Sequence, residues 1–211
     1  MTHIYIEAES DKTPEYNFLK AIIANISPDK KEKVDFEFYF LSGEANLFSE
    51  KGSNKQTIQK AQAEGTKVIV ILDADTIEKG WGYEKRKKQI EEGMKQNSVS
   101  VDYFIYPNNR DEGDVETLME EIARKDLHKT FFDCFEKYEM CISGENDENG
   151  KQKYNTPNLK GKLHTYITAQ KLSNKKKSKL GKGNWLFDDK EFWDLDSEVL
   201  NPLKEFLKKY L

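Results

Sequence analysis

The chain has 211 residues, of which 36% are hydrophobic, enough for one substantial core with a small appended unit at most. No run approaches the roughly 18 apolar residues of a membrane span, and the first residues lack the pattern of a secretory signal. This excludes an integral membrane protein and predicts a soluble, cytoplasmic one. Cys134 and Cys141 lie about 10.5 Å apart along a predicted helix, too far for a disulfide, and are expected to be reduced and partly buried.

The net charge of −4 conceals a strong asymmetry along the chain. Residues 151–187 contain ten lysines and no Asp or Glu, whereas residues 188–211 carry a net charge of −3, which leaves −11 for residues 1–150. An acidic body with a segment of charge +10 predicts a polyanionic partner for that segment, or docking of the segment on the body.

From the N-terminus onward, the hydrophobic pattern predicts strands that alternate with helices. A short apolar run ends in Glu7, and the helix after it has Thr13 as its predicted N-cap and Pro14 at its first position. The predicted strands are residues 4–6, 34–41, 67–76 and 99–106, and the predicted helices are residues 14–26, 55–64, 84–96, 114–123 and 127–142. The alternation predicts an α/β fold, an open sheet of about four mainly parallel strands with helices on both faces.

The third predicted strand is the most informative stretch. Its sequence, KVIVILDADT, is β-branched or aliphatic without polar alternation, as in a central parallel strand covered on both faces. Asp73 and Asp75 follow at its carboxyl end and are expected to point the same way, because side chains alternate along an extended chain. Such carboxylates repel each other unless a cation lies between them, and their oxygens suit Mg²⁺. The alternative is that the pair caps a turn and the next helix.

Glu7 joins these two acids if the first and third strands are neighbours. In open parallel sheets, ligands bind outside the carboxyl ends of the strands, where neighbouring connections part to opposite faces. Three acids at one edge are costly unless they are neutralised, which favours a metal site over a simple turn. Two Mg²⁺ ions held there would stabilise the attacking and leaving oxygens of a phosphodiester, so phosphoryl transfer is the expected chemistry.

The C-terminal third has a different character. Residues 143–162 are polar and rich in turn formers, which predicts a mobile loop. A short helix to about Leu172 and a lysine-rich loop follow, and residues 194–211 form a predicted final helix. Large apolar side chains are expected to pin this tail to the core, namely Trp185, Leu186, Phe187, Phe192 and Trp193. The predicted organisation is a domain over residues 1–142, the loop, and a C-terminal segment over residues 163–211 packed on the core.

Four short motifs lie at the predicted strand ends. They are Glu7-Ala8-Glu9-Ser10-Asp11 before a helix, ILDADT after the third strand, a glycine-rich turn with Arg86 beyond it, and Pro107-Asn108-Asn109 leading to Gly113-Asp114-Val115-Glu116. Together these motifs resemble the TOPRIM fold. The chain is most similar to an uncharacterised TOPRIM-like family, related to overcoming-lysogeny-defect nucleases, whose members also end in a W-x-F-x-x-x-x-F-W stretch and a Leu- and Phe-rich helix.

The resemblance covers most of the chain and implies roles for the matching residues. TOPRIM domains occur in topoisomerases, bacterial primases, recombination proteins and overcoming-lysogeny-defect nucleases. The resemblance implies that Glu7 acts as general acid or base, and that Asp73 and Asp75, with Glu7, bind Mg²⁺ or Mn²⁺. Ala8 stands where the family usually has Gly, and its methyl group at a close-packed turn is expected to shift Glu7 or narrow the approach of a phosphate.

The remaining polar candidates each have a plain alternative. Asp114 and Glu116 are expected to add a second metal site, as acids after the fourth strand do in the nuclease relatives, or to cap a helix start. Arg86 is predicted to contact a phosphate, or to belong to a solvated charged face. A lysine cluster is predicted to bind nucleic acid, with His164 and Tyr166 nearby for stacking, or to serve solubility; its members are Lys175, Lys176, Lys177, Lys179 and Lys182.

Two functions of different class follow from these features. The first is an Mg²⁺-dependent enzyme of phosphodiester chemistry, most simply a nuclease in DNA repair or defence. The second is a non-catalytic TOPRIM-like module that binds nucleic acid or a protein. The three key acids favour the enzyme, whereas Ala8 favours the module or an enzyme that depends on a partner such as an ATPase. The expected partners are nucleic acid and an ATPase or other protein, and no membrane; DNA, RNA and nucleotides all stay open as substrates.

Overall fold

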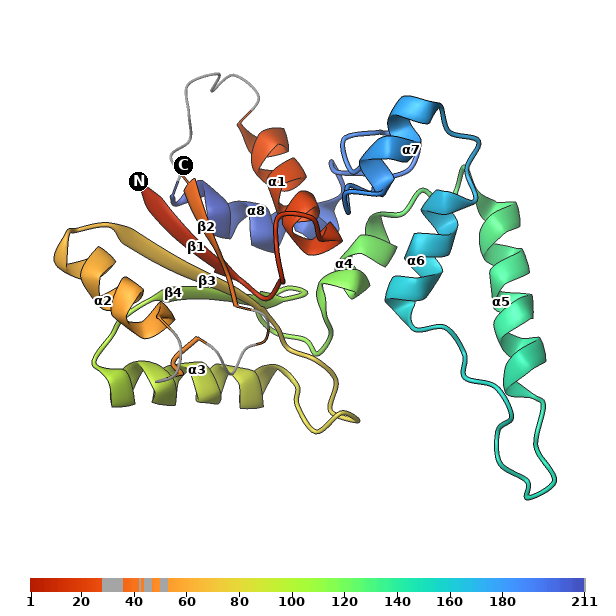
Figure 1. Ribbon diagram of the computed structural model, residues 1–211, viewed down its shortest axis with the longest axis horizontal. Helices are drawn as coiled ribbons and strands as arrows, with labels where there is room; N and C mark the ends of the chain where they lie inside the picture. The colour runs from red at the N-terminus through yellow and green to blue at the C-terminus, as the bar shows by residue number, and fades with distance from the viewer. Residues whose placement is uncertain (28–35, 42, 44–46, 50–52, 211) are drawn as a thin grey trace.

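The computed structural model describes residues 1–27, 36–41, 43, 47–49 and 53–210 (Figure 1). Its first part alternates strands with helices in the order β1 (Thr2–Ile6), α1 (Pro14–Ile26), β2 (Phe36–Phe40), α2 (Asn54–Ala63), β3 (Lys67–Asp73), α3 (Tyr83–Asn97) and β4 (Asp102–Tyr106). The rest is helical, with α4 (Val115–Ile122), α5 (Lys129–Ser143), α6 (Leu159–Thr168), α7 (Asn174–Leu180), the short 3-10 helix η2 (Glu198–Leu200) and α8 (Asn201–Lys208). The predicted strand over residues 34–41 and the predicted loop over residues 43–52 lie partly outside the described residues.

The four strands form one open, all-parallel sheet in the order β2-β1-β3-β4. The α/β fold with a parallel sheet is therefore confirmed. Residues Val68 to Leu72 of β3 are all buried, as the unbroken apolar run predicts for a strand with helices on both faces. β1 and β3 are neighbours, with Ile6 opposite Ile71.

Helices cover both faces of the sheet, and the strand side chains alternate between two cores (Figure 1). Ile69 and Ile71 face a large core with residues of α1, α4 and α8, whereas Val70 and Leu72 face a smaller core with residues of α2 and α3. The chain therefore leaves β1 toward one face and leaves β3 toward the other. Connections that part in this way open a crevice at the carboxyl ends of the two strands.

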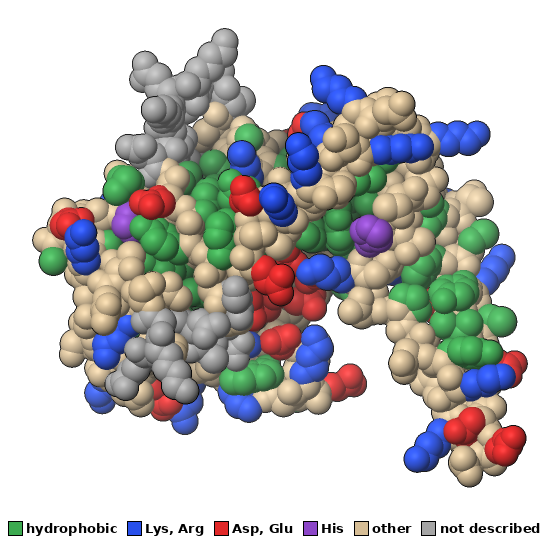
Figure 2. All heavy atoms as spheres, in the orientation of Figure 1, with side chains coloured by type: hydrophobic (Ala, Val, Ile, Leu, Met, Phe, Trp, Pro, Cys, Tyr) green, Lys and Arg blue, Asp and Glu red, His purple; other side chains and the backbone are tan. Residues whose placement is uncertain are grey.

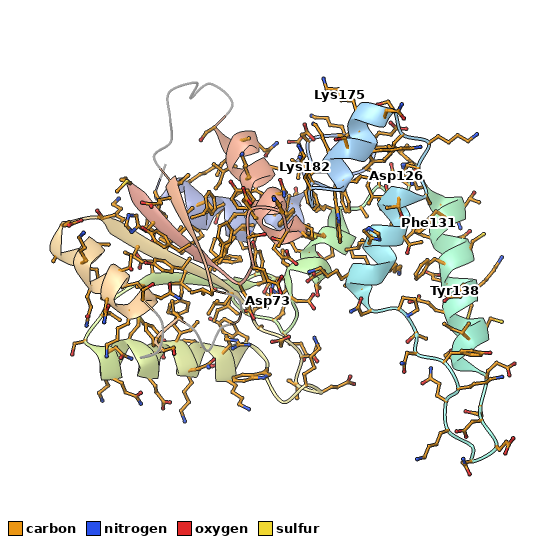
Figure 3. The ribbon with its side chains drawn as sticks, in the orientation of Figure 1. Asp73, Asp126, Phe131, Tyr138, Lys175 and Lys182 are labelled. Carbon is orange, nitrogen blue, oxygen red and sulfur yellow. The ribbon has the colours of Figure 1, made fainter. Side chains whose placement is uncertain are left out.

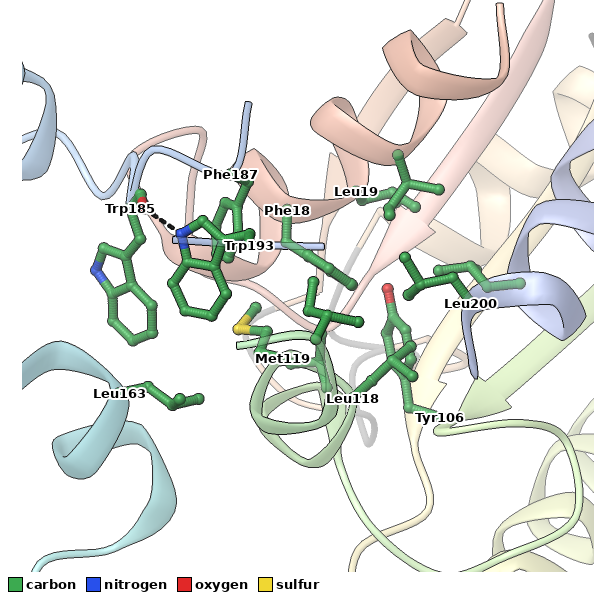
Figure 4. Packing of buried hydrophobic residues seen from close by; sticks show 14 of the residues in the cluster. Phe18, Leu19, Tyr106, Leu118, Met119, Leu163, Trp185, Phe187, Trp193 and Leu200 are labelled. Atoms are coloured by element: carbon green, nitrogen blue, oxygen red, sulfur yellow. Dashed lines mark hydrogen bonds between the residues drawn. The ribbon is translucent and has the colours of Figure 1, made fainter. Parts of the chain in front are cut away.

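The aromatic stretch before the last helix joins the same large core as the sheet (Figure 4). Trp193 is fully buried, and its Nε1 donates a hydrogen bond to the Trp185 carbonyl at 2.7 Å. Tyr166 of α6 is also fully buried, and its hydroxyl donates to the Phe192 carbonyl at 3.1 Å. Truncating a buried Trp to Ala costs about 3–5 kcal/mol, so these rings hold the C-terminal segment on the sheet.

Two predicted elements differ from the structure near the C-terminus. The lysine-rich segment is the helix α7 rather than a loop, because Ser173 accepts a hydrogen bond from the Lys176 N–H and caps the helix start. The predicted final helix begins at Asn201 instead of residue 194. The segment before it is held alongside the end of α4, where the Asp194 N–H donates to the Ile122 carbonyl at 2.8 Å.

The helix α5 extends away from the sheet (Figure 1). It buries Phe132 and Phe135, whereas Cys134 and Cys141 are both exposed, so the prediction of partly buried cysteines was wrong. Both cysteines are free, as predicted. Within the part of the chain that the structure describes, no helix has both the length and the apolar character that crossing a membrane requires.

Candidate active site

Glu7 and Asp73 lie side by side because β1 and β3 pair. Asp73 is the last residue of β3, Glu7 directly follows β1, and the Asp73 N–H donates to Glu7 Oε2 at 3.4 Å. Ala8, next along the chain, is 6% exposed and packs in the large hydrophobic core. The methyl group that distinguishes Ala8 from Gly thus has a place in that core; its predicted effect on Glu7 stays a prediction.

The start of α4 completes this acidic crevice. Asp73 Oδ1 accepts a hydrogen bond from the Val115 N–H at 2.9 Å, in the first turn of the helix. Asp114 is the N-cap, since its carboxylate accepts from the Thr117 N–H at 2.9 Å, which bears out its capping role. Glu116 follows in the first turn and is 7% exposed. Figure 2 shows acidic side chains gathered near the middle of the face it presents.

The carboxyl group of Asp73 is the most perturbed of this acidic set. Burial raises its pKa well above the usual value, and the charges of Glu7, Glu116 and Asp114 raise it further. The hydrogen bond from the Val115 N–H acts in the opposite direction but is outweighed. Among the described residues, no Lys or Arg lies within ion-pair distance of the Asp73 carboxylate. Asp73 itself therefore has no ion-pair partner in the part of the chain that the structure describes.

A lysine from α6 reaches the rim of the crevice. Lys160 Nζ lies 3.2 Å from Glu116 Oε1 and also pairs with Glu15 in the first turn of α1. Burial raises the pKa of Glu116, and Lys160 partly counteracts that rise. The Tyr106 ring is buried nearby, and burial, followed by the charge of Asp73, raises the pKa of its hydroxyl well above normal.

Sequence reasoning missed Glu15, Tyr106 and Lys160. Glu15 lies in the first turn of the helix after β1 and Tyr106 is the last residue of β4, so both could have been found by their places at the carboxyl edge. Nothing in the sequence around Lys160 indicates its position, because it is brought there by the packing of α6 against α4.

Asp75 does not share the surroundings of Asp73. Its φ of +57° places it in the left-handed region, outside β3, so the alternation that would align the two side chains is broken. Asp75 Oδ2 lies 3.0 Å from Arg86 Nη2, and Oδ1 lies 3.3 Å from Lys79 Nζ. The expectation that both carboxylates point the same way is therefore wrong: Asp73 turns to α4 and Asp75 to α3.

Arg86 is fully buried, rather than on a solvated face. Its Nε donates to the Asp73 carbonyl at 2.9 Å, and its guanidinium lies over the Trp81 ring, 4.3 Å from the ring centre. With the ion pair to Asp75, these contacts fix the turn after β3. A direct contact between Arg86 and a phosphate stays a prediction, and it would require this cluster to open.

A family model described as "Protein of unknown function (DUF3226)" matches residues 2–211. The chain belongs to this family. A search of curated proteins finds no match, and a search of solved structures finds none either.

The acids of this DUF3226 protein have the chemistry to bind a hard cation, but their side chains are not arranged around a common point. Carboxylate oxygens are the ligands that Mg²⁺ prefers. Burial, and then the charges of the neighbouring acids, raise the pKa of Asp73. In the described part of the chain, however, no three His, Cys, Asp or Glu side chains are already grouped as a metal site. Glu7 and Asp73, with Asp114 or Glu116, would hold an ion only after side-chain rotation. Asp75 would first have to leave its ion pair with Arg86.

The lysine cluster of the DUF3226 protein lies on another part of the molecule. Figure 3 shows Lys175 and Lys182 near α7, apart from Asp73 at the sheet edge. Lys176 pairs with Asp189 at 2.7 Å and Lys179 approaches Asp188 at 3.6 Å, whereas Lys175, Lys177 and Lys182 are exposed. Nucleic-acid binding by this cluster stays a prediction. The buried Tyr166 has no free face for a base, so the suggestion that it stacks there was wrong.

Proposed function

We propose that this protein is an Mg²⁺-dependent enzyme of phosphodiester chemistry on nucleic acid, most simply a cytoplasmic nuclease of DNA repair or defence, with a TOPRIM-like fold. One observation supports this above all. Glu7, Asp73, Asp114 and Glu116 lie at the carboxyl edge of the parallel sheet, where burial and then the charges of the other three acids raise the pKa of Asp73. A divalent cation is the ligand that relieves this repulsion, and phosphodiester cleavage is the chemistry that such a cation serves.

In this proposal, each group of the crevice has a distinct role. Mg²⁺, with Mn²⁺ as a substitute, would supply positive charge for the developing charge of the reaction; Asp73 and Glu7 would hold it, with Asp114 or Glu116 at a second position. Glu7 also lines a hollow of about 390 Å³, which lies within the roughly 300–1,000 Å³ typical of ligand sites. Lys12 and Lys160 also line this hollow, beside Glu9 and Glu15, and would pair with a phosphate entering there. Glu7 would take a proton from the attacking water, or give one to the leaving oxygen.

The second candidate is a non-catalytic module that binds nucleic acid or a protein. It is favoured by the ion pairs of Asp75 with Arg86 and Lys79, which already neutralise one of the expected ligands. An intermediate case is an enzyme whose acids are drawn together only by a partner, such as an ATPase.

A cleavage assay separates these candidates. The purified protein is incubated with supercoiled plasmid, single-stranded DNA and RNA, each with Mg²⁺, Mn²⁺ or a chelator, beside the Glu7→Gln variant. We expect cleavage with the metals only, and a fall of about 10²- to 10⁴-fold in Glu7→Gln, the usual contribution of general acid–base catalysis.

Glu64→Gln is the matched control. Glu64 is an exposed residue at the end of α2, near the amino-terminal end of β3 and so at the end of the sheet opposite the crevice. It should cleave as the wild type does. Equal cleavage by Glu7→Gln would exclude the role of Glu7. No cleavage by the wild type, together with tight binding of nucleic acid, would favour the module or a partner-dependent enzyme.

A further inference from the structure

A groove of about 690 Å³ runs along the free edge of β4. β4 is the last strand of the sheet, so its outer edge lies open between α3 on one face and α8 on the other (Figure 1). Residues from five separate parts of the chain line this groove. The ones that matter here are three lysines and three tyrosines: Lys67, Lys87, Lys209, Tyr83, Tyr103 and Tyr210.

The three lysines give the groove a positive charge. Within the described residues, none of them forms an ion pair, in contrast to Lys176 and Lys179 of α7. Asp102 is the one acid in the lining, and its carboxylate accepts a hydrogen bond from the Tyr210 hydroxyl. A cationic groove on a protein of net charge −4 is a surface for a polyanion.

Two tyrosine rings of the groove, Tyr103 and Tyr210, are held in place and remain partly exposed. The Tyr103 hydroxyl donates to Glu91 Oε1 at 2.9 Å, and Tyr210 is held by Asp102. Lys67 Nζ lies 5.6 Å from the centre of the Tyr210 ring. Fixed rings interleaved with lysines are the pattern by which proteins bind single-stranded nucleic acid, since every base has a face that stacks on an aromatic ring.

A peptide strand is a poorer occupant of the same edge. An added β-strand needs the outward backbone groups of β4. At Ile105 these groups are already used, because the Ile105 N–H donates to Asn109 Oδ1 at 2.7 Å and the Asn109 N–H donates to the Ile105 carbonyl at 2.8 Å. A polymer recognised through its phosphates and bases does not depend on them.

We infer that the β4 groove binds single-stranded nucleic acid and leads it to the acidic crevice. Asn109, which lines the groove, follows β4 three residues after Tyr106, and Tyr106 is paired with Asp73, so the groove reaches the carboxyl end of β4 beside the strand that carries Asp73. The second part of this inference, that the groove leads nucleic acid to the acidic crevice, rests on the proposed function. Binding itself requires neither metal nor Glu7.

The test is binding of fluorescein-labelled oligothymidylate and oligouridylate, measured by anisotropy in chelator over a range of salt concentrations. The variant is Lys87→Gln/Lys209→Gln, and the matched control is Lys137→Gln/Lys151→Gln, which removes two exposed lysines of α5 and of the loop after it. Losing two contacts to phosphate should lower the salt slope of log K by about 1.4 and the affinity at 0.1 M salt about 10- to 30-fold. This control should bind as the wild type does.

Thermal unfolding should be the same for both double variants, because the groove lysines hold no ion pair among the described residues; Lys67→Gln is a second variant should the first fail to fold. Unchanged binding by the groove variants would overturn the inference, as would tighter binding of duplex than of single strands. Failure of the wild type to bind either polymer would also overturn it. Cleavage dependent on Glu7 would still support the proposed function in each case.

Discussion

Asp73 and Asp75 are two residues apart, yet basic side chains neutralise the carboxylate of Asp75 and none pairs with that of Asp73 among the described residues. The Asp75 region is a closed ion-pair cluster, in which Arg86, fully buried, and Lys79 neutralise the carboxylate. The Asp73 region is the acidic crevice, in which burial and then the charges of three further acids raise the pKa of the carboxyl group. The ion-pair cluster fixes the turn after β3. In the acidic crevice the carboxylates repel one another, and a bound cation would reduce that repulsion. Charge compensation, more than the motif, thus separates a structural carboxylate from a candidate catalytic one.

The largest expected effect comes from breaking the compensated region. Arg86→Met keeps the length of the side chain but leaves Asp75 without its buried partner. Removing one member of a buried ion pair costs about 3–5 kcal/mol; because Lys79 remains and Asp75 is partly exposed, we expect about 3 kcal/mol. Urea denaturation measures this loss. Lys88→Met, on the exposed side of the same helix, should change the free energy of unfolding by less than about 0.5 kcal/mol; a similar loss in both variants would contradict the role of the pair.

The opposite sign is expected in the uncompensated region. Asp73→Asn keeps an oxygen to accept from the Val115 N–H and removes the charge, so without metal it should stabilise the protein at neutral pH. The pKa of Asp73 is higher in the folded than in the unfolded state. Its favourable contribution is therefore complete below the unfolded value, about 3.9, and is lost as the pH rises through the folded value. Urea denaturation at a series of pH values should show the two proteins diverging over that range.

Metal reverses this difference if the crevice binds it. Mg²⁺ at ten times its dissociation constant should stabilise the wild type by about 1.4 kcal/mol and Asp73→Asn by much less. Asp75→Asn serves as the comparison, since its carboxylate is already paired. An equal response to Mg²⁺ in the wild type and Asp73→Asn would exclude Asp73 as a ligand.

The smallest effect is expected at the rim of the crevice, where Lys160 forms ion pairs with Glu15 and Glu116. Lys160→Gln breaks two ion pairs of a side chain that is 47% exposed, and such pairs contribute up to about 1 kcal/mol. Differential scanning fluorimetry should show a slightly lower melting temperature without metal and a larger rise on adding Mg²⁺ than in the wild type, because Glu15 and Glu116 are freed. Lys151→Gln, in the exposed polar loop, should match the wild type. The same rise in both would show that Lys160 does not compete with the metal.

Much of this framework follows from local patterns in the sequence. The apolar run of β3 predicts a central strand, and the carboxylates after β1 and β3 predict an acidic edge, because parallel strands end at the same side of a sheet. The Thr13 cap and Pro14 start of α1 were also predictable, since both are set by neighbouring residues.

The remaining features depend on contacts that no local pattern encodes. The positive φ of Asp75 is maintained by its bridge to Gly113, where the Gly113 N–H donates to the Asp75 carbonyl at 3.0 Å. Arg86 looks like one charge among many on α3 until Trp81 and Asp75 bury it. The lysines of the β4 groove are scattered from residue 67 to residue 209, whereas the conspicuous cluster on α7 is partly neutralised by acids that follow it in the chain.

The pairing of β1 with β3 also bears on how the chain folds. Glu7 and Asp73 are 66 residues apart in sequence, and the strand of the sheet between them in the chain, β2, lies on the far side of β1. Their contact is therefore non-local. The chain must lose the entropy of closing a long loop before the burial of apolar side chains stabilises the pair of strands. The repulsion between the two carboxylates arises at the same step. The pairing of β1 with β3 is therefore the step of folding that this repulsion opposes. A cation that later settles between them would slow the separation of those strands, and occupancy of the crevice would then extend the lifetime of the whole fold.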